Sequence, residues 1–163
     1  MCGIIGAASS RSVGKILIKG LQLMEYRGYD SAGVVLNKDE EILRLRSLGK
    51  VSKLEEIMIS EKPKAFSGIA HTRWATHGAP SEENAHPHGS HDDIYIVHNG
   101  IIENHEEIRC SLRNKGYEIA SETDSELIAH LVHFYKKENQ DTLQALMKAT
   151  TELNGAYSIA VVC

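Results

Sequence analysis

The chain opens with a short apolar stretch, Cys2-Gly3-Ile4-Ile5-Gly6-Ala7-Ala8, in which a cysteine directly follows Met1. The length and small side chains of this stretch are typical of a buried strand, where cysteine behaves as a small hydrophobic residue. Removal of Met1 would instead leave a thiol and a free α-amine on the same residue. Because an α-amine is partly unprotonated near neutral pH, it can take the thiol proton directly or through one water. Position alone favours the structural interpretation of Cys2, so the rest of the chain must decide.

The composition is that of an ordinary globular chain with one domain. Its 163 residues suffice for one core and are too few for two domains of ordinary size. Charged residues make up 25% of the chain and the net charge is -4 with both signs interspersed, which argues against binding to nucleic acid. No apolar run is long enough for a bilayer, and the amino terminus lacks the features of a signal peptide. We therefore expect a cytoplasmic protein without a membrane partner.

The cysteines and histidines form no recognised disulfide or metal pattern. Cys2, Cys110 and Cys163 are odd in number and lack C-x-x-C spacing, and Cys110 is expected in packing or at the surface. His86, His88 and His91 surround Pro87, but neither a cysteine nor a helical His-x-x-x-His pair accompanies them. We interpret this segment as a polar loop and expect neither a metal nor a cofactor.

Hydrophobic periodicity predicts a mixed α+β chain. We expect strands over 32–37, 42–47, 68–72, 94–98 and 156–162, with the first two forming a hairpin that places Arg44 and Arg46 on one face. Short helices are expected over 53–59 and 104–115, the second ended by Gly116. Because strands and helices do not alternate strictly, the sheet should be largely antiparallel.

Three further helices are predicted from caps and apolar faces. Ser12 is expected to cap a helix that runs to about Tyr26, before Gly28. Its predicted buried face consists of Val13, Ile16, Leu17, Leu21 and Met24. Asp124 or Ser125 should cap a helix that buries Leu127, Ile128, Leu131, Val132 and Tyr135. Asp141 should cap a last helix through Leu143, Leu146 and Met147.

Five more segments are rich in glycine and polar residues, and suit a functional site better than a core. They are EYRGYDSAG (25–33), GIAHTRWATHG (68–78), NAHPH (84–88), VHNGIIEN (97–104) and SETDSE (121–126). In this order, and following CGIIG (2–6), they resemble the glutaminase domain of the glutamine–fructose-6-phosphate aminotransferases, which are class II glutamine amidotransferases. The resemblance extends over the whole chain.

This resemblance implies a four-layer αββα sandwich of the N-terminal-nucleophile hydrolase type. It also implies that residues 1–163 are a partial glutaminase domain, incomplete at the carboxyl-terminal end and without the sugar-isomerase region. The implied reaction is hydrolysis of glutamine to glutamate and ammonia. In hexosamine biosynthesis, the ammonia would convert fructose 6-phosphate, bound by the absent isomerase region, to glucosamine 6-phosphate. We expect the full-length enzyme to be a homo-oligomer.

Glutamine hydrolysis requires a nucleophile, a base and donors for the oxyanion. The resemblance assigns Cys2 as the nucleophile, Asn99 and Gly100 as the oxyanion hole, and Arg27 as a residue that orients the site. A fixed cation beside the nucleophile would also favour its thiolate form. Taken alone, Asn99-Gly100 is more simply interpreted as a turn between a strand and a helix.

Charged groups are also needed to hold the amino acid zwitterion. Arg73 can make a bidentate contact with the substrate α-carboxylate, and Asp124 can pair with the α-ammonium. The resemblance adds the remaining pocket residues, which lie in a loop over 73–80: Trp74, Thr76 and His77. The alternatives are that Arg73 is a surface ion-pairing residue, that Asp124 is a helix cap and that Trp74 is a partly buried aromatic residue. His71, His86 and His98 are interpreted as structural residues at the edge of the site.

Two other functions remain open from the sequence. One is the glutaminase domain of a class II amidotransferase with another acceptor, of the phosphoribosyl pyrophosphate amidotransferase or asparagine synthetase type. The other is a non-catalytic fragment in which sheet edges are left without partner strands.

Overall fold

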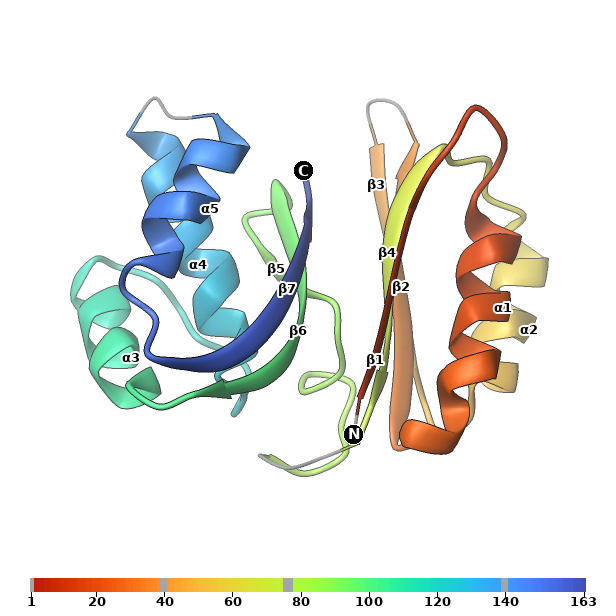
Figure 1. Ribbon diagram of the computed structural model, residues 1–163, viewed down its shortest axis with the longest axis horizontal. Coiled ribbons are helices and arrows are strands. Elements are labelled where there is room, and N and C mark those ends of the chain that lie inside the picture. The colour runs from red at the N-terminus through yellow and green to blue at the C-terminus, as the bar shows by residue number, and fades with distance from the viewer. Residues whose placement is uncertain (1, 39–40, 75–77, 139–140) are drawn as a thin grey trace.

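A computed structural model of the protein describes residues 2–38, 41–74, 78–138 and 141–163. Two antiparallel sheets face each other, and helices cover the outer face of each sheet, so that the layers run α, β, β, α (Figure 1). The elements in chain order are β1 (Gly3–Ala8), α1 (Gly14–Met24), the 3-10 turn η1 (Glu25–Arg27), β2 (Ser31–Lys38), β3 (Glu41–Leu48), α2 (Val51–Glu61), β4 (Ser67–Arg73), β5 (His88–Ser90), β6 (Ile94–Ile102), α3 (His105–Asn114), α4 (Ser125–Lys137), α5 (Thr142–Thr150) and β7 (Gly155–Val162). This arrangement confirms the expected α+β sandwich.

The first sheet has the strand order β1-β4-β2-β3 and carries α1 and α2 on its outer face. Leu17 and Leu21 of α1 and Leu54 of α2 are fully buried with Leu36 of β2 in this layer. The predicted hairpin is confirmed: β2 pairs with β3 with Leu36 opposite Leu43. The central position of β4 between β1 and β2 places the end of β4 beside the start of β1.

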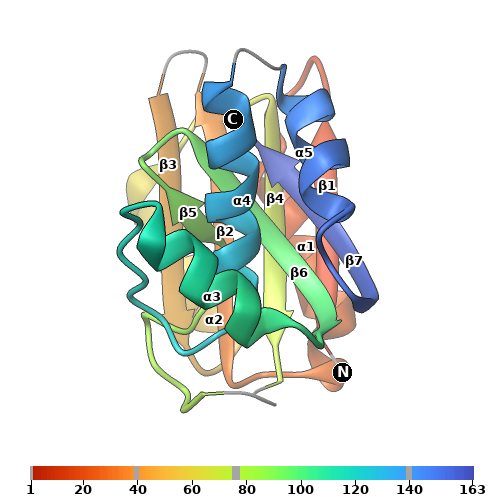
Figure 2. The ribbon, with the colours of Figure 1, turned by 90° about the vertical axis from the view of Figure 1, so that its left-hand side faces the viewer.

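The second sheet has the order β5-β6-β7 and packs against α4 (Figure 2). The predicted apolar face of α4 is confirmed, since Leu127, Ile128, Leu131 and Val132 are fully buried and Tyr135 nearly so. Between the two sheets lies a separate small core of Val35, Ile69, Tyr95 and Val97. Apolar burial on both faces of each sheet therefore holds the four layers together.

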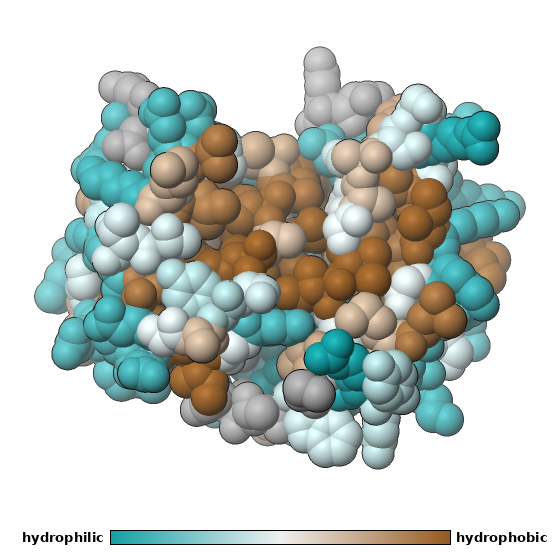
Figure 3. Space-filling view, in the orientation of Figure 1, coloured by the Kyte–Doolittle hydropathy of each residue, from teal (hydrophilic) through white to brown (hydrophobic). Residues whose placement is uncertain are grey.

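Each sheet ends in an edge strand on the same side of the molecule, namely β1 and β7. Figure 3 shows apolar side chains gathered between the sheets on this side. A cavity of about 500 Å³ opens there, lined by residues that include Ala7, Ile69, Val161 and Val162. In the described parts of the chain, no helix is long and apolar enough to cross a membrane.

The first helix differs from its prediction at the amino-terminal end. Ser12 does not cap it: α1 begins at Gly14, with Val13 in the cap position and no capping hydrogen bond from a side chain. Ile16 is 52% exposed, and Ile18 takes its place in the core beside Leu17 and Leu21. The apolar residues of this segment are compatible with two neighbouring faces, and only packing on the sheet selects one.

The last helix has the predicted cap but buries small residues. The Oδ1 atom of Asp141 accepts a hydrogen bond of 2.9 Å from the backbone N–H of Gln144, as expected. Leu143 and Met147 are mostly exposed, however, and the buried residues of α5 are Ala145 and Ala149. Small residues on the inner face let α5 lie close to α4.

Candidate active site

Cys2 lies directly before β1, and its thiol contacts the backbone just beyond β4. The backbone N–H of Trp74 donates a hydrogen bond of 3.2 Å to Cys2 Sγ, and Sγ lies 3.7 Å from the Trp74 carbonyl oxygen. The antiparallel register places Gly3 opposite Thr72, so the two strands deliver Cys2 and Trp74 to the same end of the sheet. A Cβ atom at Gly3 would lie only 2.9 Å from Thr72 Oγ1, which explains the glycine after the cysteine.

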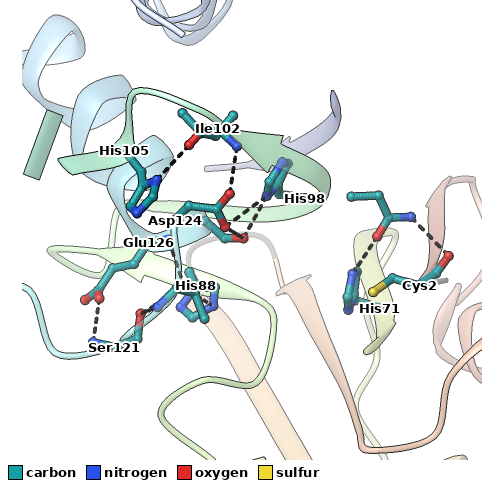
Figure 4. Close-up of polar contacts among 12 residues, drawn as sticks. Cys2, His71, His88, His98, Ile102, His105, Ser121, Asp124 and Glu126 are labelled. Atoms are coloured by element: carbon teal, nitrogen blue, oxygen red, sulfur yellow. Dashed lines mark hydrogen bonds and ion pairs between the residues drawn. The ribbon is translucent and has the colours of Figure 1, made fainter. Parts of the chain in front are cut away.

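Asn99 reaches Cys2 from the second sheet. Its Nδ2 donates a hydrogen bond of 3.2 Å to the Cys2 carbonyl oxygen, and its Oδ1 is 2.9 Å from His71 Nε2. Figure 4 shows Cys2 and His71 close together and draws these two hydrogen bonds as dashed lines. A single side chain of β6 therefore contacts both β4 and the residue before β1.

The interpretation of Asn99-Gly100 as a turn is wrong, because β6 continues through both residues to Ile102. Asn99 lies opposite Ser158 and Gly100 opposite Tyr157 in β7. Gly100 has a φ of 141°, and a Cβ atom there would collide with the Ala156 carbonyl oxygen. Glycine is thus required by the close approach of β7, which local sequence patterns do not reveal.

Arg73 is the last residue of β4 and is only 4% exposed, so the alternative of a surface ion pair is wrong. Its guanidinium donates long hydrogen bonds of 3.3 and 3.4 Å to the carbonyl oxygens of Gly78 and Ala79. Burial lowers the pKa of Arg73, whereas nearby Cys2, Asp30 and Asp124 raise it. Arg73 therefore interacts electrostatically with the candidate nucleophile and with Asp124, its proposed partner in zwitterion binding.

Asp124 occupies the cap position of α4, but its side chain makes no capping hydrogen bond. Its φ and ψ of -72° and -23° are helical, whereas a capping side chain needs an extended backbone. Instead, Oδ2 accepts a hydrogen bond of 2.9 Å from the backbone N–H of Ile102, at the end of β6 (Figure 4). The capping alternative is therefore wrong, and the carboxylate is turned towards the strand that carries Asn99.

His98 lies beside this carboxylate without neutralising it. The ring atom Nδ1 is 2.8 Å from Ser125 Oγ and 3.8 Å from Asp124 Oδ1. Burial lowers the pKa of His98, although the charge of Asp124 opposes the shift. A neutral His98 leaves Asp124 with its negative charge available to a cationic ligand.

The structure gives fewer contacts for the remaining predicted site residues. Arg27 ends η1, and the next residue, Gly28, packs so closely on the backbone of Arg73 and Trp74 that a Cβ atom would lie 2.9 Å from Trp74 N. The role of Arg27 beside Cys2 stays a prediction. Trp74 is 45% exposed, with its ring 5.9 Å from that of Tyr29 in an edge-on contact. Thr76 and His77 lie outside the described residues.

The expected polar loop around Pro87 is wrong for two of its histidines. His86 and His88 are 5% and 3% exposed, and the ring of His86 lies 4.0 Å from that of His71 and 4.7 Å from that of His88. Burial lowers the pKa of each of these three rings, so they pack as neutral groups. Among the described residues, no group of three or more histidine, cysteine or acidic side chains is arranged to hold a metal ion.

Two residues that sequence reasoning did not single out hold the backbone at Ala79. Asn84 Nδ2 donates hydrogen bonds of 3.0 Å to the Ala79 carbonyl oxygen and to Glu122 Oε2, and Glu122 Oε2 also accepts one of 3.2 Å from Ala79 N. Asn84 and Glu122 belong to the polar segments 84–88 and 121–126, and this membership was the feature of the sequence that could have pointed to them. These segments thus hold the chain beside Arg73.

Two facing antiparallel sheets between helical layers, with a cysteine directly before the first strand, are the architecture of the N-terminal-nucleophile class. Two solved structures share this fold over 99% of the chain and 35% of their own. They are the glutamine phosphoribosylpyrophosphate amidotransferase of B. subtilis (TM-score 0.85, 22% identity) and an allosteric regulatory enzyme of purine biosynthesis (TM-score 0.86, 23% identity). The sequence profile of the family described as "Glutamine amidotransferase domain" matches residues 71–163, and the chain belongs to this family.

Relatives of higher identity carry a more specific name. The glutamine--fructose-6-phosphate aminotransferase [isomerizing] of Haemophilus influenzae is 56% identical in an alignment of 163 positions that covers 99% of this chain and 26% of the relative. The protein of the same name from Legionella pneumophila strain Paris is 51% identical over 99% of this chain and 27% of its own length. The chain therefore spans about a quarter of the length of these relatives.

Proposed function

We propose that this chain hydrolyses the side-chain amide of glutamine to glutamate and ammonia, with the Cys2 thiol as nucleophile. One observation carries the proposal: Asn99 of the second sheet donates a hydrogen bond to the Cys2 carbonyl oxygen, and the Cys2 thiol accepts one from the backbone N–H of Trp74. Trp74 directly follows Arg73. A nucleophile, an amide donor and a buried cation thus come together from three distant parts of the chain.

The first half of the reaction would form a thioester. After removal of Met1, the α-amine of Cys2 takes the thiol proton, and Sγ attacks the amide carbon of glutamine. The Trp74 N–H that donates to Sγ stabilises the thiolate. Negative charge on the substrate oxygen would be met by Asn99 Nδ2 and the backbone N–H of Gly100. The C–N bond then breaks, and the leaving nitrogen takes the former thiol proton from the protonated α-amine of Cys2 and departs as ammonia.

The second half would restore the enzyme. Water attacks the thioester carbon with the α-amine as base, the C–S bond breaks, and glutamate leaves with the thiol reprotonated. Asn99 and Gly100 serve both halves, because both pass through a tetrahedral oxyanion. Recognition of glutamine would rest on Arg73 for its α-carboxylate and Asp124 for its α-ammonium. Arg27, Trp74, Thr76 and His77 complete the proposed site.

For the whole protein, we propose delivery of this ammonia to fructose 6-phosphate, which yields glucosamine 6-phosphate. The identity of 51–56% to enzymes of that name over nearly all of this chain supports the sugar acceptor. The likeness to a phosphoribosylpyrophosphate amidotransferase, at 22% identity, supports only the fold. In this proposal, residues 1–163 are a partial glutaminase domain, fructose 6-phosphate binds to a sugar-isomerase region outside them, and the full-length enzyme is a cytoplasmic homo-oligomer.

Release of glutamate and ammonia from glutamine tests the proposal directly. We expect the protein without Met1 to release both in equal amounts and Cys2→Ser to release neither. A folded, Met1-free protein that releases no glutamate would refute glutaminase activity and favour the non-catalytic alternative. Circular dichroism with a thermal melt establishes folding in each sample.

A further inference from the structure

We propose that His71 is a positioning residue, which holds the Asn99 carboxamide so that its nitrogen rather than its oxygen faces Cys2. The inference rests on the proposed glutaminase function and assigns to His71 a role in the oxyanion-stabilising step. It acts through Asn99, without contact to the reacting atoms.

The neighbours of Asn99 fix the direction of its amide. The Cys2 carbonyl oxygen can only accept a hydrogen bond, so the group 3.2 Å away must be the nitrogen, Nδ2. The amide oxygen, Oδ1, consequently faces His71 Nε2 at 2.9 Å, and Nε2 must carry the proton. A carboxamide nitrogen has two N–H groups, and the bond to Cys2 uses one of them. The other is thereby kept on the nucleophile side for the substrate oxyanion.

The protonation of His71 suits this role. The ring is 1% exposed, and burial lowers its pKa to about 4, so that at neutral pH it has a single N–H. If that proton moved to Nδ1, two acceptors would face each other across 2.9 Å. If the amide turned over, its oxygen would face the Cys2 carbonyl oxygen. Each alternative replaces a hydrogen bond with repulsion between lone pairs, so the two bonds enforce one orientation.

The surrounding structure holds the His71 ring in place. His71 is in β4, between Ile4 of β1 and Gly33 of β2. The His86 ring covers it at 4.0 Å, with 31° between the ring planes. Gly33 permits this packing, because a Cβ atom there would collide with the His86 carbonyl oxygen. The donor that orients Asn99 is therefore itself immobilised from two sides.

Two substitutions that differ by one methylene test the proposal. In His71→Gln the side-chain amide can place its nitrogen near the former Nε2 and still donate to Asn99, whereas in His71→Asn it is too short. Loss of one oxyanion donor costs about 10²- to 10³-fold in kcat. In His71→Asn the donor is still present but no longer held in place, so we expect kcat for glutamine hydrolysis to fall by about 10- to 100-fold. In His71→Gln we expect a fall of less than about threefold. KM should change little in both, because the zwitterion contacts are untouched.

Alkylation of Cys2 by iodoacetamide separates positioning from general damage. This displacement forms no oxyanion, so its rate at Cys2, followed by peptide mass spectrometry, should match the wild type in His71→Asn. In an Asn99→Ala background, His71→Asn should cause no further loss of kcat, because the residue through which His71 acts is gone.

Several results would overturn the inference. They are wild-type kcat in His71→Asn, a parallel fall of kcat and alkylation rate in both variants, or an undiminished effect of His71→Asn in the Asn99→Ala background. Absence of glutaminase activity in the wild type would be a different result, since it would refute the proposed function itself.

Discussion

Replacement of Asp124 by asparagine should remove a charge from the proposed substrate site while preserving its local structure. The asparagine oxygen can keep the 2.9 Å hydrogen bond from the Ile102 N–H, and its nitrogen can face His98 Nδ1. What disappears is the negative charge that would meet the glutamine α-ammonium. Hydrogen bonds to charged groups contribute about 1.5–3 kcal/mol and neutral ones about 0.5–1.5 kcal/mol. The difference of about 1–1.5 kcal/mol corresponds to an about five- to thirteenfold lower kcat/KM.

The assay is release of glutamate, with the rate of Cys2 alkylation as a measure of thiol reactivity. Asp93→Asn is the matched control, because it also removes one negative charge, but at the start of β6, away from Ile102. Asp93 lies directly before β6 and pairs with Lys136 at 2.6 Å. That control should keep wild-type kcat/KM. Asp124→Ala should also lower the melting temperature, because it leaves the Ile102 N–H without its acceptor. If Asp124→Asn has wild-type kcat/KM and stability, Asp124 does not bind the α-ammonium and the reasoning fails.

Three further predictions concern processing, labelling and acidity. Intact mass spectrometry should find Met1 removed. A form that retains Met1 should lack glutaminase activity, because its Cys2 has no free α-amine. Equal activity in both forms would exclude the amine as base. A glutamine analogue with an electrophilic group should label Cys2 and spare the exposed Cys110 and Cys163, whereas labelling mainly at Cys110 would contradict the assignment. Burial lowers the pKa of His71 from 6.5 to about 4, so the unfolded chain binds the proton first as pH falls. The stability contributed by neutral, buried His71 is therefore complete above pH 6.5 and is lost towards pH 4. Thermal melts that do not change between pH 7 and 4.5 would refute this prediction.

Local periodicity accounts for the parts of the fold that were predicted well. In α4 the apolar residues recur at helical spacing, and in β2 and β3 alternation and a short connection fix both the strands and their pairing. These patterns involve neighbours a few residues apart, so the chain encodes them locally. Where two faces were locally possible, as for Ile16 and Ile18 of α1, the prediction chose wrongly.

The site residues were named from motifs, but their contacts span long distances in sequence. Asn99 is 97 residues from Cys2 and 28 from His71, and no periodic pattern relates such positions. The direction of the Asp124 side chain depends on its helical backbone and on the N–H of Ile102, 22 residues away. His86 is buried against the ring of His71 in the first sheet, and His88 Nε2 lies 3.1 Å from Thr123 Oγ1, 35 residues away, so a locally polar segment became part of the interior.

The sequence by itself determined most of the element types, because these follow from local pattern, and its motifs named the candidate site residues through their resemblance to a family. Only the tertiary structure decided that Asn99 and Gly100 lie within a strand and that Arg73 is buried. It alone placed His71, a presumed edge residue, in contact with the amide that faces Cys2. The physical reason is that a hydrogen bond between two sheets needs both backbones in register across the core, and the packing of the four layers sets that register.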